Sequence, residues 1–203
     1  MSNPLLDEFM KLCGDAPYDL FGREVNFERS LELFQARDRL CSQYAWAIPD
    51  EAALDMLVEL SPVVEIGGGL GYWGSLVNEM GGDMIVFDKY VNERGHVRLY
   101  NEDTNILPYM PVFKGEHEAA ELHADRTLFL CWPPYGTDMG YLCLKTYLDN
   151  GGHTLVYVGE GEGGCTADDA FHELMESKMV HQRTIRIPSW QGLHDRFEVW
   201  MVE

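Results

Sequence analysis

Apolar and polar positions along the chain follow the pattern of strands and helices taken in turn. Pro49 and Asp50 are typical of a helix start. Apolar residues at helical spacing predict helices at 4–13, 27–45, 47–60, 72–80 and 167–176. Short apolar runs between polar or glycine-rich segments predict strands at 63–66, 84–88, 111–114, 127–131, 154–159, 184–188 and 197–202.

The order of these segments predicts an α/β fold. Strands that alternate with helices build a doubly wound, mostly parallel sheet, here seven-stranded, with helices on both faces. The link at 189–196 is too short for a parallel crossover, so the last strand should run antiparallel. No Pro/Ser-rich linker divides the chain. We therefore expect a single domain over 1–203, with a helical cap at 1–46 and an α/β core at 47–203.

Composition narrows the classes of function. The 203 residues are 46% hydrophobic, which is enough for a sizeable core. The formal net charge is −19 and no cluster of Lys and Arg forms a basic groove, so nucleic acid is an unfavoured partner. The five cysteines show no Cys-x-x-Cys spacing, so we expect no metal site. Without a signal-peptide pattern or a long apolar run, we expect a cytoplasmic protein with no membrane partner.

A glycine-rich segment follows the first predicted strand and reads Glu65-Ile66-Gly67-Gly68-Gly69-Leu70-Gly71. Glycines allow a sharp turn and let the backbone approach a bulky ligand without a Cβ in the way. Asp88 ends the next strand, where a carboxylate can accept hydrogen bonds from both hydroxyls of a ribose. A helix-capping role is the alternative for Asp88. Together the two features predict a site for a nucleoside cofactor.

The cofactor class follows from the acidic residue. Residues 69–74 also fit the Gly-x-Gly-x-x-Gly pattern of dinucleotide sites. That pattern starts late relative to the strand, and Glu65 would place a carboxylate near a pyrophosphate. A cofactor with an ammonium and a sulfonium is compatible with this carboxylate, so we favour it over a nicotinamide or a flavin.

With this loop and this element order, the chain resembles the class I S-adenosylmethionine-dependent methyltransferases over residues 50–203. The resemblance implies S-adenosylmethionine as cofactor, with Glu65 near its methionine amino group and Asp88 on its ribose. It implies Glu116 at the adenine, with a solvent-facing Glu116 as the alternative. Tyr44 and Trp46 either cover the cofactor or anchor the cap. The expected cofactor-binding residues are Tyr44, Glu65, Gly67, Gly69, Gly71, Asp88, Glu116, Trp132 and Pro133.

The fourth predicted strand ends in Trp132-Pro133-Pro134-Tyr135. Amino-methyltransferases of this family carry Asp or Asn before the two prolines, and that side chain, with the first proline's carbonyl, accepts hydrogen bonds from the target amine. Trp132 offers only an indole N–H donor. The resemblance therefore implies stacking of an acceptor on Tyr135 more than transfer to amines of bases. Packing of Trp132 on the cofactor or the core is the alternative.

Two loops should join this corner, because the carboxyl ends of parallel strands meet at one edge of a sheet. They are the glycine-rich loop at 159–166 and the connector at 189–196. Thr166 and Asp169 predict a capping box for the following helix. His194 is a candidate base oriented by a carboxylate, or else a polar turn residue. The expected catalytic residues are Tyr135, His194 and Asp195, and the expected substrate-binding residues are Pro134, Tyr135, Glu160, Asp168 and Trp190.

These features predict a methyltransferase that acts on a small-molecule acceptor and yields S-adenosylhomocysteine. Two alternatives stay open. The Pro-Pro-Tyr corner supports an N6-adenine or amino-type nucleic-acid methyltransferase. The altered residue before it permits a non-catalytic protein that binds S-adenosylmethionine.

Overall fold

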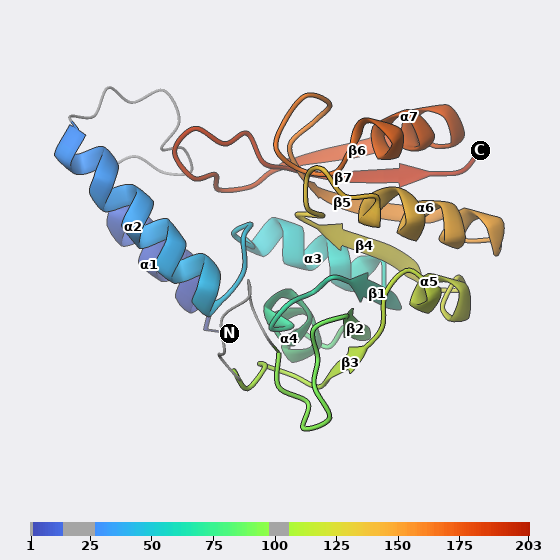
Figure 1. The fold of residues 1–203 in the computed structure, drawn as a ribbon, viewed down its shortest axis with the longest axis horizontal. Coiled ribbons are helices and arrows are strands. Elements are labelled where there is room, and N and C mark those ends of the chain that lie inside the picture. The colour runs from blue at the N-terminus through green and yellow to red at the C-terminus, as the bar shows by residue number, and fades with distance from the viewer. Residues whose placement is uncertain (1, 14–26, 98–105) are drawn as a thin grey trace.

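The structure, a computed structural model, describes residues 2–13, 27–97 and 106–203. Helices and strands alternate through these residues in the predicted order (Figure 1). The helices are α1 (Pro4–Cys13), α2 (Phe27–Gln43), α3 (Glu51–Glu59), α4 (Tyr72–Glu79), α5 (Glu118–Leu122), α6 (Met139–Asp149) and α7 (Asp169–Lys178). The strands are β1 (Val63–Ile66), β2 (Met84–Asp88), β3 (Val112–Lys114), β4 (Thr127–Cys131), β5 (Thr154–Gly159), β6 (Val180–Arg186) and β7 (Arg196–Met201).

One seven-stranded sheet organises the fold, in the order β3-β2-β1-β4-β5-β7-β6. Strands β1 to β5 pair in parallel, and β7 pairs antiparallel with both β5 and β6. This confirms the predicted mostly parallel sheet with an antiparallel last strand. It also places the connector between β6 and β7 at the edge where the loops after β1, β4 and β5 leave the sheet.

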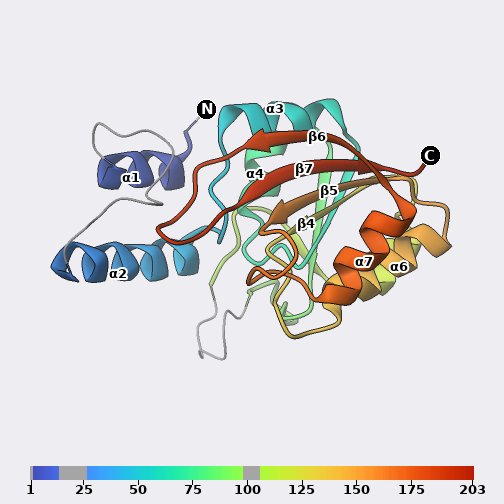
Figure 2. The same cartoon turned by 90° about the horizontal axis from the view of Figure 1, so that it is seen from above.

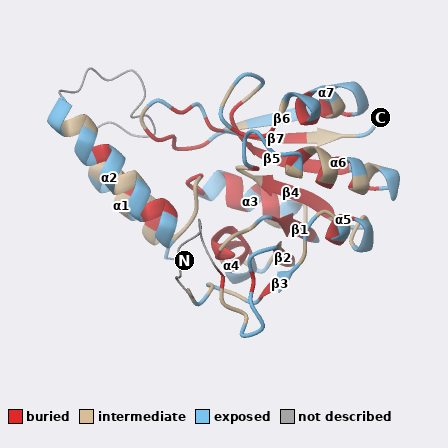
Figure 3. Ribbon diagram, in the orientation of Figure 1, coloured by how far each residue is buried: buried red, intermediate tan, exposed pale blue. Residues whose placement is uncertain are grey.

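The strands present their two faces to different helices (Figure 2). Helices α3 and α4 cover one face, and α5, α6 and α7 cover the other. Figure 3 shows that buried residues concentrate on the central strands. Because neighbours in a strand point to opposite faces, each central strand supplies both cores. Val63, Phe129 and Val156 face α3 and α4, whereas Val64, Leu128 and Leu155 face the other helices.

The structure corrects three expectations about the elements. Helices α5 and α6 were not predicted, although buried Gly140, Cys143, Leu144 and Tyr147 give α6 a helical period. Strand β6 starts before the predicted residue 184, because it is an exposed edge strand without an apolar pattern. The capping box at Thr166 is wrong. Asp168 caps α7 through Phe171 N, and the Thr166 hydroxyl contacts Tyr157 and Glu160 instead.

Helices α1 and α2 lie together beside the sheet, on the side away from α5 to α7 (Figure 1). Leu5 and Phe9 of α1 are fully buried in the same core as α3 and α4. The Tyr72 hydroxyl donates to Asn3 Oδ1 at 2.8 Å and accepts from Leu5 N at 3.2 Å. Because Tyr72 is the first residue of α4, these bonds tie the cap to the end of the glycine loop. None of the helices among the described residues is long and apolar enough to cross a bilayer.

The Tyr72 hydroxyl generates a stability prediction. Tyr72→Phe should lower the free energy of unfolding by about 1–2 kcal/mol, because Leu5 N loses its acceptor and Asn3 Oδ1 keeps only its bond from Leu6 N. Tyr90→Phe, at an exposed ring, is the matched control and should change little. Urea denaturation followed by circular dichroism measures both variants. Equal stability of Tyr72→Phe and the parent protein would show that these bonds do not hold the cap.

Candidate functional site

The glycine loop joins β1 to α4 in a conformation that favours glycine. Gly67, Gly69 and Gly71 have φ values of 79°, 54° and 68°, in the left-handed region that L side chains rarely adopt. A Cβ on Gly68 would lie 2.7 Å from the Glu65 carboxyl carbon and closer still to Val86. The loop is therefore packed tightly over β1 and β2, and its first residue, Gly67, is exposed at the surface.

Glu65 lies beneath this loop as a buried carboxyl group. Only 2% of it is exposed, and its Oε2 has no hydrogen-bond partner. Burial raises the pKa of Glu65 to about 8, and the nearby Asp88 carboxyl adds to the shift. Without a ligand the neutral form is therefore favoured at neutral pH. An orphaned carboxyl oxygen beneath a glycine loop fits a cationic group of a ligand, because a charge partner offsets the cost of ionising it.

Asp88 is held at the end of β2 with its carboxylate against the loop. Oδ2 accepts from Gly69 N at 3.0 Å and Oδ1 from Tyr90 N at 2.8 Å. Burial raises the pKa of Asp88, and these two hydrogen bonds oppose the shift. Each carboxylate oxygen has a second lone pair, so both can still accept from a pair of hydroxyls. This geometry fits the expected ribose role.

Two other expected cofactor residues lie around this loop with contacts of their own. Glu116 is exposed, and its Oε1 lies 3.5 Å from Lys89 Nζ. The Tyr44 ring stacks on Tyr109 at 5.8 Å between centroids and packs against Tyr72 at 5.0 Å. Tyr44 therefore anchors the cap to α4, and a covering role over the cofactor stays a prediction.

The corner after β4 is built around Trp132. Its φ is 54°, an unfavourable conformation for a residue with a Cβ, with a cost of about 1–3 kcal/mol that surrounding contacts must offset. The backbone N–H donates to Val158 O at 2.8 Å, and the indole Nε1 donates to Asp195 Oδ1 at 2.8 Å. The indole also stacks on Trp46 at 5.1 Å. Trp132 thus joins β4 and β5 to the connector and to the cap.

The prolines of the corner differ in what they present. The Pro133 carbonyl accepts from Ala167 N at 2.8 Å, and Pro134 forms a bridge with Thr166. Pro133 is buried, whereas Tyr135 is 63% exposed. The side chain before the prolines, Trp132, is therefore a donor where an acceptor for a target amine is expected. The other expected acceptor, the Pro133 carbonyl, already accepts one hydrogen bond from Ala167 N. Pro134 and Tyr135 are the members that face solvent.

Glu160 brings the two predicted loops together. Its Oε1 accepts from His194 N at 2.9 Å and lies 3.2 Å from His194 Nδ1. Its Oε2 accepts from Cys165 N at 2.9 Å. Burial raises the pKa of Glu160, but the hydrogen bonds from Cys165 and His194 outweigh it and hold the pKa below its usual value. Glu160 is thus the carboxylate that orients His194, and the imidazole is 54% exposed.

The remaining predicted residues have structural contacts in the same region. Asp195 is buried and bonded to Trp132, and burial raises the pKa of Asp195 to about 7. Trp190 is buried as well, with Nε1 on Trp46 O at 2.9 Å, and its substrate-binding role stays a prediction. The Asp168 carboxylate caps α7. Within the described residues, no group of three or more His, Cys, Asp or Glu side chains could hold a metal ion.

Sequence reasoning did not single out Arg37 of α2 or Gln191 of the connector. The structure brings both residues to one small pocket between these two segments. The available signal was weak. Arg37 stands one turn after Phe34 in a helix of mixed charge, where arginines are usually solvated. Only the packing of α2 against the connector brings Arg37 to a pocket.

Comparison with known proteins supports the fold. No protein-family model matches the chain, and no curated protein does. Among solved structures, magnesium protoporphyrin IX methyltransferase (ChlM) from Synechocystis PCC 6803 with bound SAM matches with a TM-score of 0.50 and 12% identity over 97% of this chain and 90% of that chain. A TehB-like SAM-dependent methyltransferase from Corynebacterium glutamicum ATCC 13032 Kitasato matches at 0.43 and 15% over 88% of this chain and 100% of that chain. CalO1, a methyltransferase in calicheamicin biosynthesis, matches at 0.45 and 13% over 98% of this chain and 68% of that chain. The sheet order and the likeness to ChlM show the Rossmann-like fold of class I SAM-dependent methyltransferases.

Proposed function

We propose that this protein is an S-adenosylmethionine-dependent methyltransferase that acts on a small-molecule acceptor. The observation that carries the proposal is Glu65, a buried carboxyl with an orphaned oxygen beneath a glycine loop that also bonds Asp88. A cofactor with an ammonium group and a ribose matches both carboxyls. The bound cofactor would supply an electrophilic methyl group on sulfur.

Each group of the cofactor has a residue that could hold it. Glu65 would bind the methionine ammonium, and Asp88 the ribose hydroxyls. The backbone of residues 67–71 would pass beneath the ligand, where side chains would obstruct it. Glu116 would reach the adenine from the segment after β3. Trp132, Pro133 and Tyr44 would border the cofactor from the corner and the cap.

The acceptor side would use the loops after β4 and β5 and the connector. Tyr135 and Pro134 are exposed at the corner and suit stacking on a ring. We assign to His194 the removal of a proton from the acceptor, because Glu160 fixes its ring through Nδ1 and the imidazole is exposed. Methyl transfer otherwise depends on in-line positioning of the nucleophile, the methyl carbon and the sulfur.

Two observations disfavour nucleic acid as the acceptor. The chain carries a net charge of −19, which repels a phosphate backbone. The corner lacks the side-chain acceptor for a base amine, because Trp132 offers only a donor, which is already bonded to Asp195. The same changes favour one second candidate, a protein that binds S-adenosylmethionine without catalysis.

The ribose assignment predicts the effect of Asp88→Ala. The affinity for S-adenosylmethionine should fall by about 1–3 kcal/mol, since the ribose hydroxyls lose their acceptors. Isothermal calorimetry measures the affinity. Asp83→Ala, at the start of the same strand region and paired with Arg126 on the surface, is the control and should bind as the parent protein does. Unchanged affinity of Asp88→Ala would remove Asp88 from the ribose role. Heat with NAD but none with S-adenosylmethionine would reject the cofactor.

The buried carboxyl predicts a pH dependence. The pKa of Glu65 is about 8 before binding, and a cationic ligand requires the carboxylate, so binding at neutral pH should release a proton. Affinity should rise by up to about tenfold per pH unit below pH 8 and fall again once the ligand's ammonium, an α-amino group, loses its proton. Calorimetry in buffers of different ionisation enthalpy detects the proton. Glu65→Gln should bind more weakly and lose this linkage. A parent-like pH profile in Glu65→Gln would contradict the assignment.

The raised pKa of Glu65 also predicts how the stability of the ligand-free protein depends on pH. At pH values between 4.5 and 8, stability should fall as pH rises, whereas the affinity for the cofactor should increase. The carboxyl has an ordinary pKa of 4.5 when unfolded and about 8 when folded, so the folded state binds more protons between these values. The Glu65 contribution to stability therefore declines as pH rises from 4.5 to 8. Glu65→Gln lacks this decline and should be the more stable protein at pH 8, measured by urea denaturation. A less stable variant at that pH would show that Glu65 is partnered without a ligand.

Catalysis is tested by transfer of labelled methyl in a cell lysate, with denatured protein as background. The parent protein should label a small-molecule fraction. His194→Ala should reduce labelling by about 100-fold or more while the cofactor affinity stays unchanged. His181→Ala, at an exposed histidine on β6, is the control. Tight cofactor binding with no labelled product would support the non-catalytic candidate, and label in nucleic acid would support the other alternative.

A further inference from the structure

Helix α2 exposes apolar side chains along one side. Phe27, Leu31 and Phe34 have 82%, 48% and 47% of their surface exposed. Because they are spaced four and three residues apart, they form one row along the helix. Among the described residues, no other helix or strand carries more than one exposed large apolar side chain. Exposed apolar side chains that are grouped in this way mark an interaction surface.

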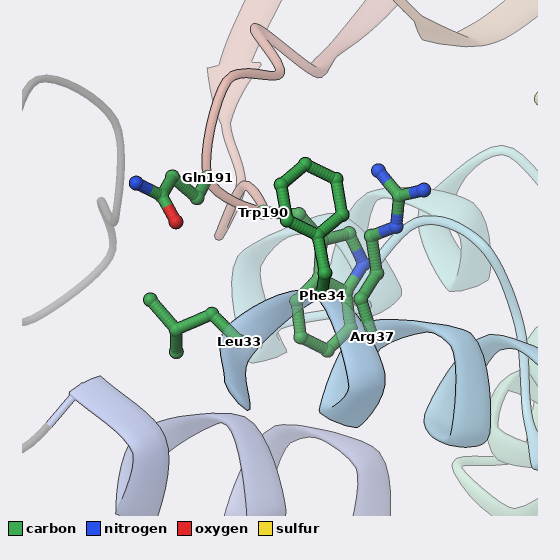
Figure 4. A pocket seen from close by; sticks show the side chains of 5 residues that line it. All are labelled: Leu33, Phe34, Arg37, Trp190 and Gln191. Carbon is green, nitrogen blue, oxygen red and sulfur yellow. The ribbon is translucent and has the colours of Figure 1, made fainter. Parts of the chain in front are cut away.

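This row lies at the outer edge of the molecule. Figures 1 and 2 show α2 at the end of the fold that is remote from α5 to α7. The helix packs on the body through Leu33 and Leu40, which are buried on another side of it. Phe34 also borders the small pocket between α2 and the connector (Figure 4), but this pocket is too small for an organic ligand. The exposed row therefore suits a protein partner.

The charge of α2 favours a second copy of this chain as that partner. Three acidic and three basic residues lie along the helix, namely Glu28, Glu32 and Asp38, and Arg29, Arg37 and Arg39. Their charges sum to zero, whereas the whole chain carries −19. Two copies of the chain repel each other over most of their surfaces, but they can approach through α2 without this repulsion. A basic partner would instead be attracted to the acidic remainder of the surface.

An antiparallel pair of α2 helices is complementary in both shape and charge. When Leu31 and Phe34 of both copies meet near a two-fold axis, Glu28 of each copy lies beside Arg39 of the other. The axis repeats this contact, so two ion pairs form at the rim of one apolar centre. Arg39 is free to turn toward the other copy, because its side chain is exposed and its ion pair with Glu8 is long, at 3.8 Å.

We propose that two copies of this chain associate through α2 as an antiparallel, two-fold symmetric dimer. Leu31 and Phe34 form its centre, Phe27 packs on the last turns of the other helix, and Glu28 and Arg39 fix the direction. One pair of 17-residue helices buries less area than a standard interface, so the dimer forms weakly and reversibly. This association does not depend on the proposed function.

Analytical ultracentrifugation of the full chain tests the dimer, at about 0.15 M salt and from about 1 μM to 1 mM protein. The parent protein should pass from monomer to dimer within this range. Leu31→Glu should weaken association by about tenfold or more, because it buries a charge at the two-fold axis. Leu122→Glu, at an exposed leucine of α5, is the matched control and should associate normally. A parent protein that stays monomeric would overturn the proposal, and so would parent-like association of Leu31→Glu.

A charge exchange tests the pairing at exposed positions, where the fold tolerates substitution. Arg39→Glu should weaken association by about fivefold or more, because Glu28 of the other copy then meets a second carboxylate. Glu28→Arg combined with Arg39→Glu recreates the pair in reverse and should restore association. Circular dichroism checks that each variant is folded. Failure of the combined variant to recover would reject this register.

Cross-linking distinguishes an antiparallel from a parallel pair. Gln35 and Ser42 are both exposed on α2. The two copies of Gln35→Cys lie near the axis and should be joined by a short thiol cross-linker, whereas those of Ser42→Cys lie about 25 Å apart and should not. The parent protein gives the background from its own exposed Cys165. Equal cross-linking of both variants would reject the antiparallel pair. A monomeric protein that retains a different protein through α2 would reject the second copy as partner.

Discussion

The cost of burying a carboxyl group without a partner shapes this molecule around Glu65. The side chain projects from β1, the strand between β2 and β4 in the middle of the parallel sheet, toward the face covered by α3 and α4. The tight packing of Gly68 above it leaves no space for a compensating side chain from the loop. The ligand-free protein favours the neutral form of Glu65. A cationic group of a ligand would make the ionised form favourable.

The corner after β4 depends on a different kind of constraint. Trp132 adopts a conformation that is unfavourable for any residue with a Cβ, and three contacts hold it there: Val158, Asp195 and Trp46. In the amino-methyltransferase pattern this position contributes an acceptor for the substrate. Here its polar group is directed inward to the connector. The residue has become part of the scaffold, and the exposed ring of Tyr135 is what the corner presents.

Hydrogen bonds from one buried carboxylate organise the acceptor loops. Glu160 bonds the backbone of Cys165 on its own loop and of His194 on the connector, so two segments far apart in sequence are held in one arrangement. The connector in turn packs on Phe9 of α1 and bonds the carbonyl of Trp46 through Trp190. The orientation of His194 and the pocket at Arg37 therefore depend on the same connector.

Sequence by itself determined the order of the seven strands, the antiparallel last strand and the glycine loop with its two acidic residues, because these follow from local periodicity, short connections and the lack of a Cβ. It also placed the loops at 159–166 and 189–196 beside the corner, since the carboxyl ends of parallel strands share an edge. Tertiary structure decided which partners meet: Glu160 rather than Asp195 contacts His194, Trp132 bonds Asp195, and Asp168 caps a helix. It also brought Arg37 to Gln191. Such pairings depend on packing between segments far apart along the chain, and no local pattern encodes them.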